Sequence, residues 1–352
     1  MMRRPRFFYL LRTQYENLGD RIINRECLAL LRGYGTVRVN VVGVPQDFVA
    51  GLSLSPGEAC AAGGTFYREL FAARRAGEVV YLVLVPGAVM GAAQFVRQTV
   101  LVVGYAALKA LGVRIIRIGA SLGPFTPLRL QMERWKARMM AFIGLRDRRS
   151  LDYAREHGFP NAAPFRDFAF MLPTQLRRTG AEGGPLVLSF RAEESDELDA
   201  IAVSISRFLA RIDPEATRPL TIASQVERDR LTGRALAARV AGGRPVGYLD
   251  AADGEPALFD GYAGSACVLS NRLHVLMFAL SVGAPVRGLV HPTRNRKIIG
   301  LFEDAGLGDR LVEIADPDAV DAVPWPDRPA DPAIFSTERR ALVEAFETMV
   351  AR

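Results

Sequence analysis

The chain has 352 residues, of which 49% are hydrophobic and 24% charged, so it has enough apolar material for two globular domains. Its net charge of +7 at neutral pH favours anionic partners. The 45 Lys and Arg residues are spread along the chain, without zinc-finger spacing or a basic region followed by heptads. This distribution argues against the common nucleic-acid-binding modules, and we expect no nucleic acid partner.

Cysteine usage and hydropathy predict a cytoplasmic protein. Cys27, Cys60 and Cys267 are too far apart in sequence for a disulfide framework or a metal site, and we expect them to be reduced. Even the most apolar region, 79–118, lacks the roughly 20 clean apolar residues that a membrane span requires. The basic start of the chain, 1–12, suits peripheral contact with the anionic inner face of a membrane.

Short apolar runs alternate with helical patterns in the N-terminal half. Strands are predicted at 7–11, 37–44, 79–85 and 113–118, and helices at 19–31, 93–111 and 132–142. The continuous apolar run at 79–85 is typical of a strand that is covered on both faces. This alternation predicts parallel β-α-β units in a doubly wound sheet.

A linker is predicted at 173–185, where prolines and glycines gather without apolar periodicity. Beyond it, strands are predicted at 186–190, 220–223, 245–249, 266–269 and 286–290, and helices at 198–212, 229–241 and 273–281. The predicted fold class is α/β, with two Rossmann-like domains facing a cleft in a glycosyltransferase-B-like architecture. The N-terminal domain covers 1–172, the C-terminal domain covers 186–330, and a C-terminal helix closes the chain at 331–352.

Two small-residue motifs follow strands of the N-terminal half. Asn17-Leu18-Gly19-Asp20 lies at the carboxyl end of a parallel strand, where ligands bind, and Gly19 permits close backbone approach. Asp20 either caps the following helix or serves a ligand, and the spacing allows both. The turn 119–124, which contains Ser121, either leaves room for a ligand or is only a turn.

Two further motifs carry charge. In Arg146-Asp147-Arg148-Arg149-Ser150, one guanidinium could capture phosphate or carboxylate, or Ser150 could simply cap the next helix. Ser270-Asn271-Arg272-Leu273-His274 comes directly after a predicted strand, so Arg272 and His274 can both point toward a ligand. His274 is either a structural residue or the proton shuttle that an adjacent anion-binding Arg suits.

In this order and spacing, the four motifs resemble those of the polysaccharide pyruvyltransferase family. The family pattern continues from Arg-Leu-His along an apolar helix to Gly-x-Pro, here 283–285, and 297–304 is similar to its Lys-containing segment. The resemblance covers nearly the whole chain. One departure is the turn 86–91, which keeps small residues but lacks the family's Gly-Gly-Gly triplet.

The resemblance implies an enzyme that transfers pyruvyl from phosphoenolpyruvate to a sugar, forming a cyclic ketal. The acceptor would be a sugar or lipid-linked oligosaccharide of an exopolysaccharide or cell-surface glycan, bound on the N-terminal side, with the donor on the C-terminal side. No metal or cofactor is expected. The implied roles are His274 and Arg272 in catalysis; Arg146, Arg272 and Ser270 in donor binding; and Asn17, Gly19, Asp20 and Ser121 in binding or orienting the acceptor.

Two alternatives remain open. One is a sugar-nucleotide glycosyltransferase or epimerase of the same architecture; against the retaining transferases, Phe278 occupies the position where many carry a ribose-binding Glu. The other is a non-catalytic homologue that binds a phosphorylated ligand. The presence of both Arg272 and His274 argues against that reading.

Overall fold

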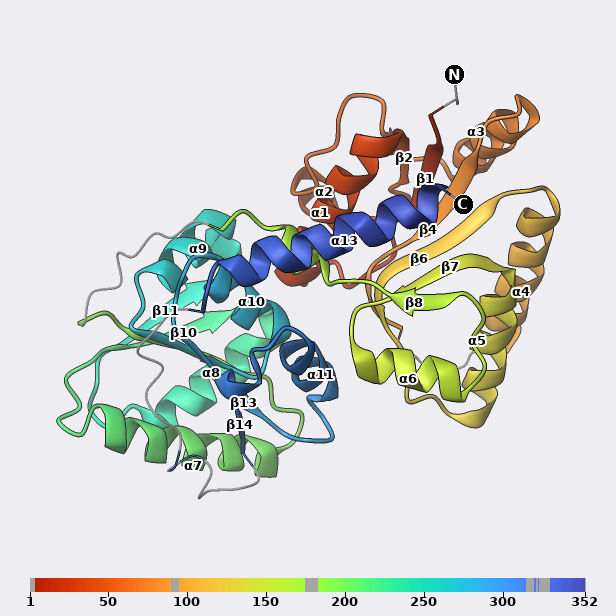
Figure 1. The fold of residues 1–352 in the computed structure, drawn as a ribbon. Coiled ribbons are helices and arrows are strands. Elements are labelled where there is room, and N and C mark those ends of the chain that lie inside the picture. The colour runs from red at the N-terminus through yellow and green to blue at the C-terminus, as the bar shows by residue number, and fades with distance from the viewer. Residues whose placement is uncertain are drawn as a thin grey trace. The chain divides into compact units, whose positions relative to one another are not determined.

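A computed structural model describes residues 4–89, 95–174, 183–314, 320, 322 and 330–351. Within these ranges the chain packs as two compact units (Figure 1). The first comprises residues up to 15, 20–168 and from 339 onward, and the second comprises 16–19 and 169–338. The predicted boundaries at 172 and 186 stay a prediction, because most of the linker, 175–182, lies outside the described residues.

The first unit is built on a parallel sheet in the order β3-β2-β1-β4-β6-β7-β8, with β5 pairing β6. Its strands are β1 (Arg6–Leu10), β2 (Thr36–Asn40), β3 (Ala59–Cys60), β4 (Val80–Leu84), β5 (Gly87–Ala88), β6 (Arg114–Ser121), β7 (Met140–Leu145) and β8 (Ala162–Pro164). Its helices are α1 (Leu18–Tyr34), α2 (Gln46–Ala50), α3 (Gly63–Arg75), α4 (Phe95–Ala110), α5 (Pro127–Met139) and α6 (Arg148–Glu156). The strand order reverses between β1 and β4, which makes that pair the topological switch point.

Helices cover both faces of this sheet because alternate side chains of each strand point to opposite faces. On one face, Phe8 and Leu82 pack with Leu70 of α3 and Tyr105 of α4. On the other, Phe7 packs against Phe346 of α13 (Ala333–Ala351), with ring centroids 6.0 Å apart. The last helix thus completes the core of the first unit.

The second unit holds a parallel sheet in the order β11-β10-β9-β12-β13-β14. Its strands are β9 (Leu186–Ser189), β10 (Leu220–Ser224), β11 (Val246–Asp250), β12 (Cys267–Ser270), β13 (Val286–Val290) and β14 (Leu311–Glu313). Its helices are α7 (Ser195–Ile212), α8 (Glu227–Val240), α9 (Glu255–Ala263), α10 (Leu273–Ser281) and α11 (Arg296–Asp304), with 3-10 turns η1 (Phe168–Met171), η2 (Ala251–Asp253) and η3 (Gly308–Arg310). Here the switch point lies between β9 and β12.

The predicted α/β class with two parallel sheets is confirmed. The predicted helix at 132–142 is wrong at its end, because α5 stops at Met139 and β7 begins at Met140. A short apolar run fits either element by periodicity, and the pairing of β7 with β6 on one side and β8 on the other decides in favour of the strand. Among the described residues, no helix is long and apolar enough to cross a bilayer.

Candidate active site

Ser270 ends β12 at the switch point of the second sheet. Its buried hydroxyl donates to the carbonyl oxygen of Ser189 at 2.5 Å and accepts from the backbone N–H of Arg272 at 2.9 Å. Ser189 is the last residue of β9, the neighbouring strand across the switch point. The hydroxyl therefore fixes the turn that leads into α10, rather than projecting into solvent.

Asn271 ties the same turn to the segment after β9. Its amide oxygen accepts from the backbone N–H of Arg191 at 2.9 Å, and its amide nitrogen donates to the carbonyl of Arg191 at 2.8 Å. The side-chain amide of Asn271 thus makes the same two hydrogen bonds with Arg191 that a backbone peptide group of a neighbouring strand would make. We assigned no role to Asn271 from the sequence, although it lies inside the motif 270–274.

Arg272 is paired with Asp229, which lies in the first turn of α8. The guanidinium Nη2 is 3.2 Å from Oδ2 of Asp229, whose side chain is buried. Burial raises the pKa of Asp229, and the nearby cations Arg272, Arg228 and Arg191 oppose that rise. Asp229 was not predicted; its position shortly after a strand, at the carboxyl edge of the sheet, was the available signal.

His274 is the second residue of α10, and its ring stacks on Phe278 one turn later. The two ring centroids are 5.8 Å apart with an interplanar angle of 11°. Phe278 is fully buried and stacks in turn on Phe259 of α9, at 5.4 Å. Because the ring that supports it is fixed by packing, the imidazole of His274 has a defined orientation.

Gly19 lies against the imidazole of His274 within the second unit. A Cβ added at Gly19 would lie 2.4 Å from Nδ1 and 2.8 Å from Cβ of His274, so only glycine allows this approach. Asn17 accepts from the backbone N–H of Gly19 at 2.9 Å, and Leu18 N–H reaches the carbonyl of Gln225 at 3.4 Å. The first and last motifs, remote in sequence, thus meet beside Arg272.

The cap of α1 is Asn17 and not Asp20. Asp20 belongs to the first unit, where its carboxylate accepts from the hydroxyl of Thr13 at 2.5 Å and the backbone N–H of Gln14 at 3.3 Å. It therefore holds the loop that follows β1. Its predicted role in orienting an acceptor stays a prediction.

Arg146 lies in a buried polar cluster at the carboxyl edge of the first sheet. Its Nε donates to the hydroxyl of Ser121 at 2.7 Å, and its Nη1 is 2.5 Å from Oδ2 of Asp167. The side chains of Arg146 and Asp167 are only 5% and 1% exposed. Their charges therefore neutralise each other inside the unit, and Asp167 is a partner that the sequence did not reveal.

Asp147 extends this cluster and caps α6. Its Oδ1 accepts from the backbone N–H of Ser150 at 2.7 Å, and its Oδ2 accepts from the hydroxyls of Ser121 and Ser150 at 2.7 and 2.8 Å. The expected cap, Ser150, instead accepts from the backbone N–H of Leu122 at 2.9 Å. Arg146 and Ser121 thus hold a turn here, and their predicted ligand roles stay predictions.

Two parallel sheets with Rossmann strand order, one of them with a His, an Arg–Asp pair and a glycine at its switch point, define a protein of glycosyltransferase-B-like fold. Solved structures of similar fold include Anabaena HepE in complex with UDP and glucose (TM-score 0.60, 11% identity, covering 98% of this chain and 99% of that one). A glycosyltransferase from Rickettsia africae matches with a TM-score of 0.59 at 9% identity, covering 98% of both chains. The UDP-GlcNAc 2-epimerase of Neisseria meningitidis matches with a TM-score of 0.57 at 12% identity, covering 98% and 99%.

The sequence model of the polysaccharide pyruvyl transferase family matches residues 17–292, well over half of the chain. The chain therefore belongs to the polysaccharide pyruvyl transferase family, and the resemblance that the motifs indicated is confirmed. The matched range begins at Asn17 and contains the whole motif 270–274. No curated protein matches this chain.

Proposed function

We propose that this protein transfers the pyruvyl group of phosphoenolpyruvate to a sugar of an exopolysaccharide or cell-surface glycan, forming a cyclic ketal. The observation that carries the proposal is the meeting of Gly19 with His274 beside the Arg272–Asp229 pair. His274 and Arg272 both follow β12 at the switch point, where α/β sheets bind ligands, and an imidazole and a guanidinium suit proton transfer and anion binding. Family membership supports the same reaction.

Ketal formation needs one protonation and two additions at the same carbon. An acid protonates the methylene carbon of phosphoenolpyruvate, and the adjacent carbon, which bears the phosphate, becomes cationic. One sugar hydroxyl attacks that carbon, the carbon–oxygen bond to phosphate breaks, and a second hydroxyl closes the ring. One hydroxyl proton replaces the proton that the acid gave to the methylene carbon, and the other leaves with phosphate.

His274 is our proposed acid, and Arg272 our proposed clamp for the donor's phosphate or carboxylate. A charge-assisted bond from a guanidinium to phosphate stabilises the charge that leaves with it. Asp229 is a positioning residue, because it acts on the donor through Arg272. Ser270 and Asn271 act through the turn that carries both groups.

On the other side, we propose that Asn17 and Gly19 line the acceptor's approach to His274, because Gly19 alone among residue types leaves the imidazole this close to the backbone. Asp20 and Ser121 remain proposed acceptor contacts. Arg146 is better placed to support the turn of Ser121 than to bind the donor directly, because Ser121 and Asp167 already engage its guanidinium.

The test is acceptor-dependent phosphate release from phosphoenolpyruvate, with a mass gain of one pyruvyl unit in a panel of galactose, glucose and N-acetylmannosamine glycosides. We expect His274→Gln to lower kcat by about 100-fold or more, the usual contribution of a general acid. Arg272→Ala should raise the KM for phosphoenolpyruvate. Arg239→Ala, which removes an exposed Arg of α8 paired with Asp199, is the matched control.

Asp229→Asn separates positioning from folding. The amide keeps the size of the carboxylate and the side chain of Arg272 is 12% exposed, so we expect the protein to stay folded at the assay temperature. We expect a higher KM for phosphoenolpyruvate, and a pH profile of kcat/KM that differs from the parent because a titrating group beside Arg272 is gone. Protection against heat by UDP-sugars and not by phosphoenolpyruvate would overturn the proposal and favour a sugar-nucleotide enzyme. Phosphate release that His274→Gln leaves intact would remove His274 from the reaction.

A further inference from the structure

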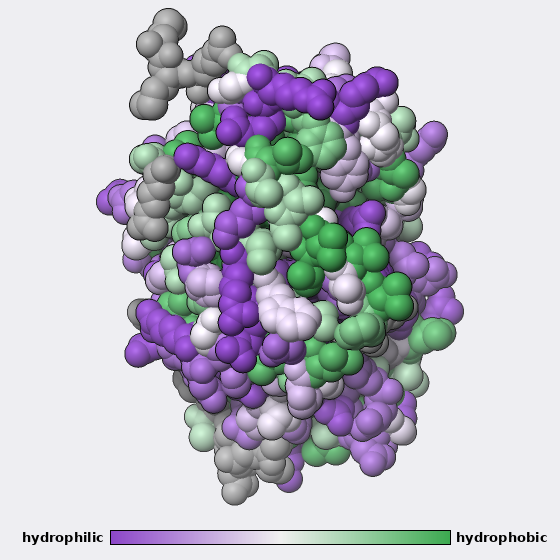
Figure 2. Space-filling view, turned by 90° about the vertical axis from the view of Figure 1, so that its right-hand side faces the viewer, coloured by the Kyte–Doolittle hydropathy of each residue, from purple (hydrophilic) through white to green (hydrophobic). Residues whose placement is uncertain are grey.

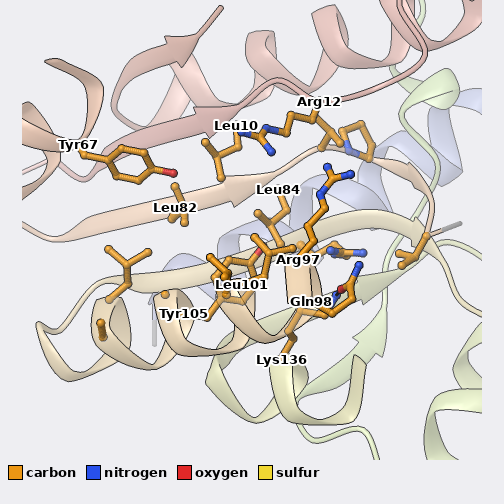
Figure 3. A pocket seen from close by; sticks show the side chains of 18 of the residues that line it. Leu10, Arg12, Tyr67, Leu82, Leu84, Arg97, Gln98, Leu101, Tyr105 and Lys136 are labelled. Atoms are coloured by element: carbon orange, nitrogen blue, oxygen red, sulfur yellow. Dashed lines mark hydrogen bonds between the residues drawn. The ribbon is translucent and has the colours of Figure 1, made fainter. Parts of the chain in front are cut away.

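A cavity of about 690 Å³ lies at the switch point of the first sheet (Figure 3). The ends of β1 and β4 form one wall and α4 forms the other, with Tyr67 of α3 and Lys136 of α5 reaching in from the flanks. The volume is within the roughly 300–1,000 Å³ typical of ligand pockets. Since α4 does not close onto the sheet here, the space is available to a ligand.

The lining changes character along the cavity. Leu82, Leu84, Leu101 and Tyr105 give an apolar stretch between the sheet and α4 (Figure 3). Five cationic side chains also line the cavity, and among the described lining residues there is no carboxylate. The cations are Arg12, Arg97, Arg117, Arg129 and Lys136. A ligand that matches both parts has a hydrocarbon portion and an anionic group.

Two of these cations have buried donors that the protein leaves unused. The Nε atoms of Arg117 and Arg129 are buried without a hydrogen-bond partner among the described residues. Glu133 pairs with Arg129 at 2.6 Å and also with Lys136, which donates to Gln98 at 2.8 Å. One carboxylate thus faces several cations, so this part of the cavity keeps a net positive charge that favours an anionic group.

The outer surface of α4 is apolar as well. Val96, Val100 and Val103 are 76%, 65% and 63% exposed, and Val100 also lines the cavity. Figure 2 shows apolar side chains gathered on this face of the molecule, beside hydrophilic ones. Exposed apolar patches of this kind mark contact with an apolar partner. A ligand that enters from a lipid phase would pass this surface.

We propose that the cavity under α4 binds a single hydrocarbon chain that carries a phosphate, with the chain along Leu82 and Leu101 and the phosphate at Arg97 and Arg117. Such an amphiphile has two sources: a lipid carrier to which the acceptor sugar is attached, or a phospholipid of the membrane, of which one of the two chains would enter the cavity. The first source rests on the proposed pyruvyl transfer; the second does not.

Gly104 offers a direct way to fill the cavity. It lines the cavity from α4, and a Cβ added there meets no atom within 4 Å. In isothermal titration of the full chain with dodecyl phosphate below its micellar concentration, Gly104→Phe should weaken binding about tenfold or more, because its ring takes the space of the chain. Thr99→Phe on the same helix, outside the lining, should change binding less than about twofold.

Matched ligands separate the two parts of the amphiphile. Dodecanol, without phosphate, and butyl phosphate, without the chain, should each bind at least about tenfold more weakly than dodecyl phosphate. Arg97→Ala should weaken dodecyl phosphate and leave dodecanol unchanged. Equal binding of dodecyl phosphate to Gly104→Phe and the parent, or no binding at all, would overturn the proposal, whatever the enzyme assay shows.

The source is decided by comparing a methyl glycoside with the same sugar on farnesyl diphosphate. If the carrier lipid is the ligand, Gly104→Phe should lower the ratio of kcat/KM for the lipid-linked over the methyl acceptor about tenfold. If membrane phospholipid is the ligand, that ratio should hold while binding to phosphatidylglycerol vesicles falls. If the parent protein turns over neither acceptor but still binds dodecyl phosphate, the proposed pyruvyl transfer is rejected and the proposed binding site in the cavity stands.

Discussion

Two arginine–aspartate pairs with buried carboxylates, one in each unit, follow strands at the carboxyl edges of the two sheets. Arg146 follows β7 and is 2.5 Å from Asp167, while Arg272 follows β12 and is 3.2 Å from Asp229. Both arginines were predicted from the sequence to clamp the donor. The structure surrounds them differently. Arg146 also bonds Ser121 within a cluster that caps α6, whereas His274, two residues after Arg272 along the chain, lies against Gly19.

The difference shows that residue type and position after a strand do not decide what an arginine does. A guanidinium that is shared among a carboxylate and a hydroxyl inside the fold neutralises its own charge there and stabilises the turn. For Arg272, which precedes His274 by two residues, we propose instead that the guanidinium binds the donor's phosphate. Four variants test this contrast.

The largest expected effect is on the first pair. Asp167→Ala should lower the free energy of unfolding of the first unit by about 3–5 kcal/mol, because it leaves Arg146 as an unpaired buried charge. Urea unfolding followed by circular dichroism measures the change. Asp152→Ala, which removes an exposed partner of Arg148, should stay within about 0.5 kcal/mol. If Asp167→Ala and Asp152→Ala lowered the free energy of unfolding equally, Arg146 would again be a candidate for binding the donor.

Gly19→Ala tests the surroundings of the second pair. The added methyl would lie 2.4 Å from Nδ1 of His274, so the imidazole must move. We expect kcat/KM for phosphoenolpyruvate to fall about 100-fold, the cost of a misplacement near 1 Å. Gly33→Ala lies in the same helix and meets nothing within 4 Å, so it should keep full activity. Retained activity in Gly19→Ala would separate His274 from the chemistry.

Asp213 provides a structural acidic residue in the second unit against which Asp229 can be judged. Burial alone would raise the pKa of Asp213, but hydrogen bonds from Arg218, Thr217 and Arg244 outweigh it and lower the pKa to about 2. This lowered pKa contributes about 2 kcal/mol of stability above the ordinary carboxyl pKa of 3.8, which is lost as the pH falls through about 2.

Asp213→Ala should therefore destabilise the second unit at pH 7 by about 2 kcal/mol and flatten its stability between pH 4 and pH 2. Thermal unfolding across that pH range measures both effects. Turnover at temperatures below the transition should not change. An unchanged acid dependence in the variant would show that other carboxylates govern acid unfolding.

Asn17→Ala has the smallest expected effect. Loss of an N-cap costs about 1 kcal/mol, so the melting temperature should fall slightly. Gln14→Ala, an exposed side chain a few residues earlier, should leave it unchanged. If the KM for the acceptor rises severalfold as well, Asn17 contacts the sugar in addition to capping α1. An unchanged KM would confine it to capping.

Most of the fold was predicted from apolar periodicity in the sequence, and the family was predicted from the order of the motifs. Buried parallel strands such as Val80–Leu84 are continuous apolar runs, and helices such as Ser195–Ile212 repeat their apolar positions every three to four residues. These signals are local, so they survive without knowledge of the tertiary contacts. The same holds for the motif around Arg272 and His274, whose position after β12 was predicted correctly.

Only the tertiary structure decided what the polar residues contact. The partners Asp167 and Asp229 are remote in sequence from Arg146 and Arg272, and they reach them only because the strand order brings particular strand ends together. The choice of Asn17 over Asp20 as cap, and the contact of Gly19 with His274, depend on side-chain directions that no local pattern encodes. The cavity under α4 has the same origin: its lining residues come from several elements, and their spacing is set by how those elements pack.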